Sequence, residues 1–169
     1  MHSLSVLLIT RTCASGKTTL GELLEAKHGY KHIDGDVVWK KVKEENKRLG
    51  SQLKVGWNEI HFDILRDSLE NIHSSNLVIT HIIYPEVLPL YQGFFAERGM
   101  RMHFIVLTPH LQTIYERNNT RTCWSKPTPK QYVDEIYEKL HKDVYKEYFL
   151  DTSDQTPEQT VEGILERVK

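Results

Sequence analysis

A glycine-lysine-threonine loop follows the first apolar segment of the chain. Residues 11–18 read Arg-Thr-Cys-Ala-Ser-Gly-Lys-Thr, which matches the phosphate-binding pattern Gly-x-x-x-x-Gly-Lys-[Ser/Thr] except at its first position. The run Val-Leu-Leu-Ile at 6–9 precedes the loop, and leucines at 20, 23 and 24 follow it with helical spacing. We therefore expect a buried strand, a tight loop and a helix, an order that belongs to α/β folds.

The loop residues suit the binding of a polyphosphate. Successive backbone N–H groups form an anion-binding nest, and the N-terminus of the following helix adds its positive dipole end. Gly16 allows close approach of the backbone, Lys17 can reach the β and γ phosphates, and Thr18 offers a hydroxyl to magnesium. A small-residue turn without function is the alternative, and the strand-loop-helix order weighs against it.

Arg11 stands where the pattern has its first glycine. If that position needs a positive φ, arginine costs about 1 kcal/mol or more there. Two hypotheses are open. Arg11 impairs nucleotide binding, or its side chain points outward and adds positive charge near the phosphates.

Composition favours a single domain over residues 1–169 and argues against a polyanionic partner. With 22 basic and 23 acidic residues the net charge is −1, so no global field favours nucleic acid or a membrane. The two cysteines give no disulfide framework, and the first apolar run is too short for a signal or membrane helix, which predicts a cytoplasmic protein. A monomer and a homodimer are both compatible with the sequence, and no histidine spacing resembles a zinc site.

Short apolar runs alternate with helical patterns along the whole chain. The expected strands are 5–10, 31–34, 77–81, 102–108 and 148–151. Thr-Pro pairs at 108–109, 128–129 and 156–157 predict helix N-caps, the last two with glutamine at the capping-box position. This alternation predicts a parallel sheet with helices on both faces.

Two carboxylates, Asp34 and Asp36, end the second expected strand. Ligands of open parallel sheets bind beyond the carboxyl ends of the strands. One carboxylate would then bind magnesium, and the other would orient an acceptor hydroxyl or take its proton. An Asx-type turn leading into a helix N-cap is the structural alternative.

Further candidates lie in the second half of the chain. Arg117 and Arg121 are four residues apart and would share a helix face, where arginine can stack on a base or bind phosphate oxygens. The polar stretch that follows, which holds Trp124, is typical of a mobile lid. His81 stands at a strand end and contacts the acceptor or only completes the strand, and Arg66 binds an anionic acceptor or is merely solvated.

Together these motifs resemble the small P-loop kinases of the gluconate kinase, shikimate kinase and adenylyl-sulfate kinase group, which are related to nucleoside monophosphate kinases. The resemblance rests on 15–19, 34–36, the Arg117/Arg121 pair and the tail 150–158. It implies a three-layer P-loop NTPase fold of five parallel strands in the order 2-3-1-4-5, with a short lid at about 118–128. It also implies ATP, Mg²⁺ and transfer of the γ-phosphoryl group to a small molecule.

The same resemblance implies roles for individual residues. Lys17, Asp36 and Arg121 would be catalytic, and Thr18 and Asp34 would serve the metal. The residues implied to bind the nucleotide are Thr12, Cys13, Ala14, Ser15, Gly16, Lys17, Thr18, Thr19, Arg117, Thr156 and Pro157.

The leading prediction is an ATP-dependent kinase for a hydroxyl acceptor that can be anionic. One alternative is a nucleotide-binding protein whose catalysis Arg11 impairs or abolishes. Another is a nucleotide, nucleoside or nucleic-acid-end kinase, and for the last of these the balanced charge is unfavourable. The middle of the chain carries no acceptor signature, so the acceptor stays open.

Overall fold

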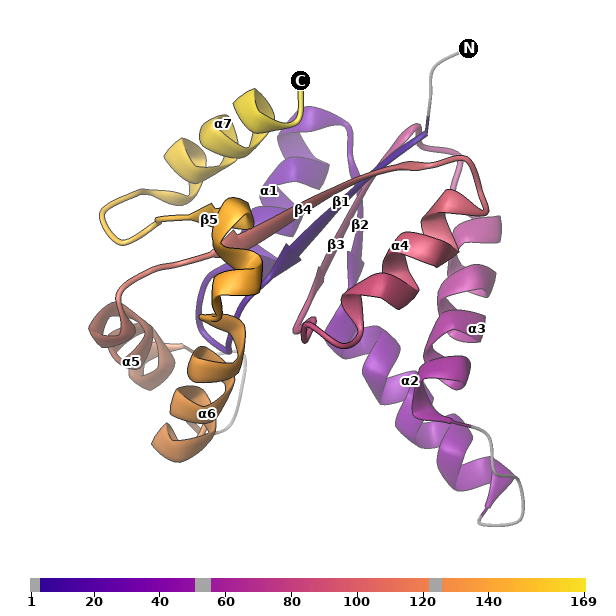
Figure 1. Cartoon of the computed structure of the whole chain (residues 1–169), viewed down its shortest axis with the longest axis horizontal. Helices are drawn as coiled ribbons and strands as arrows, with labels where there is room; N and C mark the ends of the chain where they lie inside the picture. The colour runs from indigo at the N-terminus through magenta and orange to yellow at the C-terminus, as the bar shows by residue number, and fades with distance from the viewer. Residues whose placement is uncertain (1–3, 51–55, 122–125) are drawn as a thin grey trace.

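The first strand lies at the centre of a parallel sheet in the computed structural model, which describes residues 4–50, 56–121 and 126–169 (Figure 1). The sheet order is β2-β3-β1-β4-β5, as predicted. The strands are β1 (Ser5–Thr10), β2 (Lys31–Asp34), β3 (Asn76–His81), β4 (Arg101–Leu107) and β5 (Phe149–Leu150). Their bounds agree with the predicted ones to within two residues at each end.

Side chains of β1 alternate between two apolar cores, which explains why the strand reads as a continuous apolar run. Val6 and Leu8 join one core, and Leu7 and Ile9 join the other. The register places Thr10 opposite both His81 of β3 and Val106 of β4. The carboxyl ends of the central strands therefore meet at one edge of the sheet.

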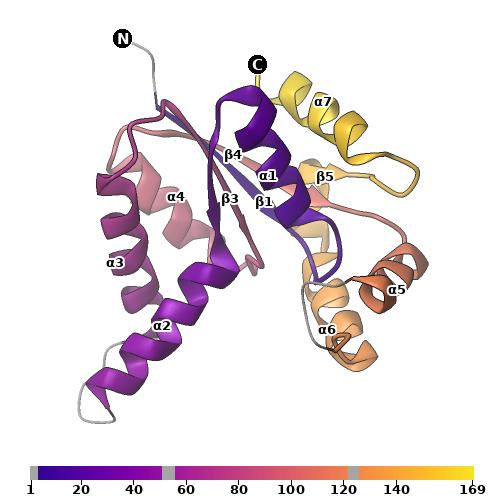
Figure 2. The same cartoon turned by 180° about the vertical axis from the view of Figure 1, so that it is seen from behind.

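Helices cover both faces, as predicted. On one face lie α1 (Lys17–His28) and α7 (Pro157–Arg167), which stand in front of the sheet in Figure 2. The elements that pack into the other core are α2 (Gly35–Leu49), α3 (Trp57–Glu70), α4 (Leu88–Ala96), α6 (Lys130–Leu140) and the 3₁₀ helix η1 (Asp143–Tyr148). The remaining helix, α5 (Leu111–Thr120), lies beside α6 beyond the end of β4. Of the helices in the described ranges, none combines the length and the hydropathy that a membrane crossing requires.

One of the three predicted threonine caps is confirmed. The Thr156 hydroxyl accepts from the Gln159 N–H, and Gln159 Oε1 accepts from the Thr156 N–H. The two bonds form the capping box of α7. The caps predicted at Thr108 and Thr128 are wrong. The backbone N–H of Thr108 bonds to Leu150 O at 2.8 Å and continues the sheet ladder, so α5 begins three residues later, at Leu111.

Thr128 is occupied by tertiary contacts instead of capping α6. The Thr128 N–H donates to Asn118 Oδ1 at 3.1 Å, and Asn118 Nδ2 donates to the Thr128 carbonyl at 2.7 Å. The Arg121 guanidinium donates to the Thr128 hydroxyl. Pro129 takes the N-cap position and the helix begins at Lys130. Hydrogen bonds to α5 and its C-cap have thus overridden a valid local signal.

Candidate functional site

The loop between β1 and α1 has the backbone shape that a phosphate cradle needs. Gly16 lies at φ 96° and forms the N-cap of α1, while Ala14 is left-handed at φ 60°. The Lys17 ammonium folds back over the loop and donates to Thr12 O at 3.0 Å. Burial lowers the pKa of Lys17, and the nearby Cys13 and Asp36 act in the opposite direction. The loop thus holds a half-buried cation that bonds to its own backbone and lines the cavity beside it.

Arg11 lies behind the loop and not over it. Its side chain is fully buried, its guanidinium carbon sits 4.0 Å from the centroid of the Tyr137 ring, and its Nη2 is 3.2 Å from His141 Nδ1. Burial lowers the pKa of Arg11 to about 10. The hypothesis that Arg11 points outward and adds positive charge near the phosphates is wrong, because its side chain is buried against Tyr137 of α6.

The positive φ that would have strained Arg11 is also absent from the structure. Among the described residues other than glycine, the positive φ falls on Ala14 alone. Arginine is therefore compatible with the backbone at the end of β1.

Two cavities open on either side of Gly16. The tail cavity has a volume of about 240 Å³ and lies between the loop and the segment before α7. It is lined by Ser15, Gly16, Thr19, Leu20, Arg117, Thr152, Gln155, Pro157 and Thr160. The loop cavity has a volume of about 320 Å³, and its lining residues are Ala14, Gly16, Lys17, Thr18, Thr19, Arg117, Thr120 and Arg121.

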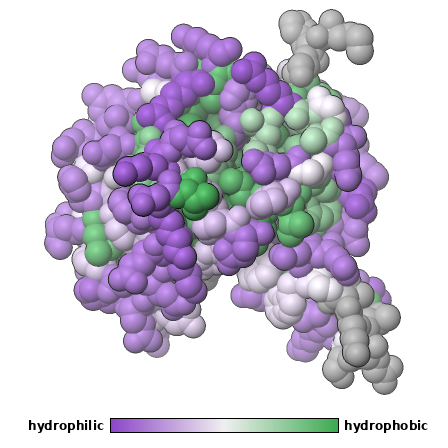
Figure 3. All heavy atoms as spheres, viewed as in Figure 1, coloured by the Kyte–Doolittle hydropathy of each residue, from purple (hydrophilic) through white to green (hydrophobic). Residues whose placement is uncertain are grey.

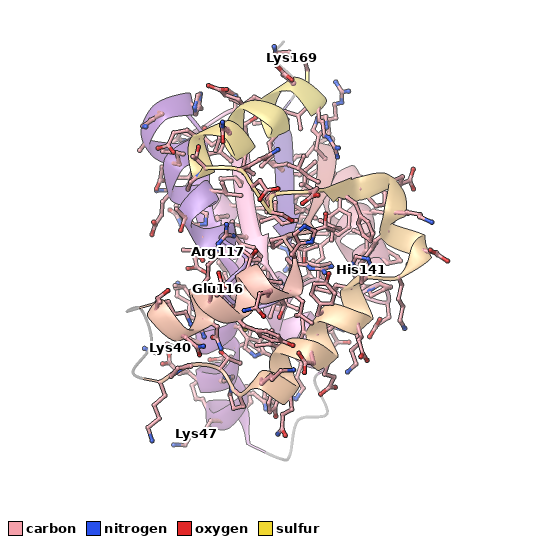
Figure 4. All side chains as sticks on the ribbon, turned by 90° about the vertical axis from the view of Figure 1, so that its left-hand side faces the viewer. Lys40, Lys47, Glu116, Arg117, His141 and Lys169 are labelled. Carbon is pink, nitrogen blue, oxygen red and sulfur yellow. The ribbon has the colours of Figure 1, made fainter. Side chains whose placement is uncertain are left out.

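Arg117 belongs to both cavities and connects α5 to the loop. It projects from α5 toward α1 in Figure 4, and its Nη1 lies 3.5 Å from Ser15 O. A Cβ on Gly16 would come within 4.0 Å of the same nitrogen, so the arginine already borders the loop backbone. The prediction that Arg117 and Arg121 face one site agrees with their shared lining of the loop cavity, although α5 ends at Thr120 and Arg121 is its C-cap.

The structure brings most of the implied nucleotide-binding residues to these cavities, with three exceptions. Thr12 is buried, and its hydroxyl lies 3.5 Å from the carbonyl of Val133 in α6. Thr156 is used as the cap of α7, next to Pro157, which does line the tail cavity. Cys13 is half-buried and is not among the residues that line either cavity.

Asp34 and Asp36 form the turn that was the structural alternative, and yet both lie near Lys17. Asp34 accepts from the Asp36 N–H at 2.9 Å and thereby caps α2. Both carboxylates raise the pKa of Lys17 against the effect of burial. Asp34 therefore caps α2 while both aspartates place negative charge near Lys17. Their roles in metal binding and catalysis stay predictions.

A third cavity, of about 350 Å³, lies where β3 ends against α2, α3 and α4, and we call it the histidine cavity. It is lined by Asp36, Trp39, Asn58, His61, His81, Ile82, Tyr84, Val87 and Tyr91. The rings of His61 and His81 stack with centroids 5.5 Å apart, and His61 Nε2 is 2.7 Å from the Tyr91 hydroxyl. Burial lowers the pKa of His61 to about 4 and that of His81 to about 3, with Lys17 adding to the second effect.

Sequence reasoning found only part of this cavity. It named His81 and Asp36 but not Trp39 or Tyr91, because an aromatic residue on a helical stripe is indistinguishable from core. His61 interrupts an apolar stripe, which was the one available signal. Arg66, offered for an anionic acceptor, bonds to Asp63 at 2.7 Å and lines a separate cavity with Leu4 and Arg98.

Some predictions fall outside these observations. Residues 122–125 of the predicted lid, which include Trp124, lie outside the described residues. Within the described ranges no group of three histidine, cysteine, aspartate or glutamate side chains is placed to hold a metal.

In the space-filling view the lower edge of the molecule is notched between the α5–α6 side and α2 (Figure 3).

No family model matches the chain. A curated relative, dephospho-CoA kinase from Buchnera aphidicola subsp. Schizaphis graminum, is 31% identical over 91 residues, which is 49% of this chain and 43% of the relative. The match thus spans less than half of that relative's length.

Among the solved structures that match over almost the whole chain are two with similar TM-scores. The tunicamycin resistance protein of Deinococcus radiodurans is 16% identical with a TM-score of 0.69, covering 97% of this chain and 95% of its own. A gluconokinase from Sinorhizobium meliloti 1021 is 17% identical with a TM-score of 0.68, covering 99% and 95%. Identities this low show the fold, and the chain has the α/β fold of the small P-loop kinases.

Proposed function

We propose that this protein is an ATP-dependent phosphotransferase that moves the γ-phosphoryl group of Mg-ATP to a hydroxyl group of a small molecule. The observation that carries the proposal is the position of Lys17. It lies in the loop cavity, and it is close enough to Asp36 and His81 in the histidine cavity to interact with both electrostatically. One cation thus stands between a phosphate cradle and a separate pocket.

The nucleotide fits across the first two cavities. Its phosphates would lie in the loop cavity against the N-terminus of α1, where Gly16 leaves the backbone accessible. Its base would lie in the tail cavity, where Arg117 offers a flat guanidinium and Pro157 an apolar surface. The residues present therefore suit a nucleoside triphosphate.

The reaction assigns a role to each charged group. Lys17 and Arg121 stabilise negative charge on the transferring group, and Asp36 orients the acceptor hydroxyl and receives its proton as the new P–O bond forms. The bond from the γ-phosphorus to the β–γ bridging oxygen breaks, and ADP leaves. Thr18 and Asp34 offer oxygen ligands of the kind that Mg²⁺ prefers, and the ion would neutralise charge on the phosphates.

Nucleotide binding without turnover is the second candidate, and it was first motivated by Arg11. The position of that side chain, buried against Tyr137 and away from the lining of both nucleotide cavities, speaks against it. A loop disabled by Arg11 would require the guanidinium to occupy the phosphate path.

Calorimetry of Mg-ATP binding tests the proposal with three proteins. The chain itself and Arg11→Gly should bind with similar affinity, whereas Lys17→Met should bind at least tenfold more weakly because it loses charge-assisted bonds to phosphate. Transfer of labelled γ-phosphate to a panel of hydroxyl compounds should occur with the first two proteins and not with the third. Binding restored only by Arg11→Gly would favour the non-catalytic candidate, and transfer by Lys17→Met would refute the site.

A further inference from the structure

The histidine cavity has a chemical character that restricts what it can hold. The ring centroid of Trp39 lies 6.4 Å from that of each histidine and 5.2 Å from that of Trp57, whose ring is tilted by 36°. Ring faces and ring edges therefore make up much of the wall. Flat rings pack well against such walls, and aliphatic sugars gain less from them.

No lysine or arginine is among the described residues that line the cavity. Of the described residues that line it, Asp36 carries the formal charge, and the two histidines are neutral at pH 7 because burial lowers their pKa values far below it. Burial likewise raises the pKa of the Tyr91 hydroxyl, which stays protonated. A carboxylate or phosphate placed here would meet the Asp36 carboxylate, while Lys17, the cation next to Asp36 and His81, lines the loop cavity instead.

Two polar atoms in this wall have no partner among the described residues. They are Nδ1 of His61 and Nδ1 of His81, both of which are buried. Buried polar atoms in folded proteins are almost always hydrogen-bonded, so an unsatisfied pair in a cavity wall indicates a ligand with complementary polar atoms. A neutral imidazole nitrogen can donate or accept according to its tautomer.

From these three features we infer that the acceptor is an uncharged hydroxyl compound bearing a flat heterocyclic ring, which lies in the histidine cavity with its ring heteroatoms bonded to His61 and His81. This inference rests on the proposed phosphotransferase function, since it assigns the acceptor of that reaction. It replaces the anionic acceptor for which Arg66 was a candidate, because that arginine lines a different cavity.

Matched acceptors separate charge from ring. Uridine and adenosine carry a ring and no charge, orotidine adds a carboxylate to the uridine ring, and methyl β-D-riboside keeps the sugar without a base. Pyridoxine with 4-pyridoxic acid gives a second ring type with and without a carboxylate. Binding of each is measured by calorimetry, without ATP and with a non-hydrolysable ATP analogue, so that binding is read independently of turnover.

At least one uncharged ring compound should bind at least tenfold more tightly than its carboxylate partner and than the riboside. Equal or tighter binding of the carboxylates, equal binding of the riboside, or no binding of any uncharged ring compound would each overturn the inference. If ring compounds bind as expected but no labelled phosphate is transferred, the proposed function fails while the assignment of the cavity holds.

Three variants place the binding in this cavity. His81→Phe keeps a ring but removes Nδ1, and it should weaken binding of the ring compound about threefold to tenfold, as for one lost hydrogen bond. Asn58→Lys adds a cation to an exposed position of the lining. It should reduce the difference in affinity between the uncharged ring compound and its carboxylate partner, orotidine or 4-pyridoxic acid. His103→Gln, on β4 outside the cavity, is the control and should change neither value. Unchanged binding in both cavity variants would show that the ring compound binds elsewhere.

Discussion

Replacing Arg11 with methionine should stabilise the protein, although it removes a side chain that contacts Tyr137 and His141. The guanidinium is fully buried, stacks on Tyr137 at 4.0 Å and has one polar contact, to His141 at 3.2 Å. Its Nε and Nη1 have no partner among the described residues. A buried cation without a carboxylate is an unfavourable arrangement that an apolar side chain of similar length avoids.

The expected magnitude follows from the pKa of Arg11, which burial lowers to about 10. Each unit below the ordinary arginine value corresponds to about 1.4 kcal/mol, so the charged form is disfavoured by about 3 kcal/mol in the folded state. Methionine is smaller, and the space it leaves unfilled should cost about 1–2 kcal/mol. We expect a net gain of about 1–2 kcal/mol in the free energy of unfolding.

Urea unfolding at pH 7 measures this gain. With a slope of about 2 kcal/mol per molar urea, the midpoint for Arg11→Met should rise by roughly 0.5–1 M. Arg11→Lys is the matched control: it keeps the charge but loses the flat stacking surface, so its midpoint should fall. A midpoint for Arg11→Met that lies below that of the unchanged protein would show that the contacts to Tyr137 and His141 outweigh desolvation, and would refute the reasoning.

Two further predictions concern the histidine cavity. The pKa values of His61 and His81, about 4 and about 3 in the folded state, lie below the unfolded value of about 6.5, so the unfolded chain binds more protons in acid. The stability they contribute is complete above pH 6.5 and is lost as the pH falls toward these values, by about 2 kcal/mol per histidine between pH 7 and pH 5. Urea midpoints at both pH values should show this loss, and the double variant with phenylalanine at both positions should lose much less; an equal loss in both proteins would contradict the assignment. Gly35→Ala should destabilise the protein by about 1 kcal/mol, since the added Cβ would lie 2.4 Å from Cγ of His81 and the repacking outweighs the gain in helix propensity. Thermal melts compare this variant with the control Gly93→Ala, where nothing lies within 4 Å of the added Cβ and the change should be neutral or stabilising. A Gly35→Ala variant as stable as that control would contradict the predicted clash with His81.

The fold was predictable because its signals are local and repeated. The strands β1, β3 and β4 show as apolar runs, and the loop at 11–18 fixes the order of strand, turn and helix at the start of the chain. The sheet order came from the family resemblance, since no residue pattern states which strands pair. The failed caps at Thr108 and Thr128 show the limit: each has the right local residues, but its polar groups bond to another element, β5 for Thr108 and the end of α5 for Thr128.

The candidate site was predictable in proportion to how much of it is motif. Lys17 and its neighbours could be named because their spacing is diagnostic, and Arg117 because it follows an expected helix. His61 and Trp39 could not, since their role depends on which face of α3 and α2 turns toward the end of β3. Arg11 was misjudged because the sequence does not show Tyr137 and His141, which lie far along the chain and receive its side chain.

Different helices line the different cavities, and this bears on how the specificity of such a protein can change in evolution. The loop and tail cavities are built by α1, α5 and the segment before α7, whereas most of the histidine cavity comes from α2, α3, α4 and the end of β3. The turn after β3 is braced from both sides, by Thr10 accepting from the Ile83 N–H at 2.8 Å and by the Tyr145 hydroxyl donating to the Ile83 carbonyl at 3.0 Å. Under the proposed function, substitutions on α2 and α3 can therefore reshape the acceptor pocket while the loop at 11–18 keeps its geometry, so a lineage can acquire new acceptors without rebuilding its nucleotide site.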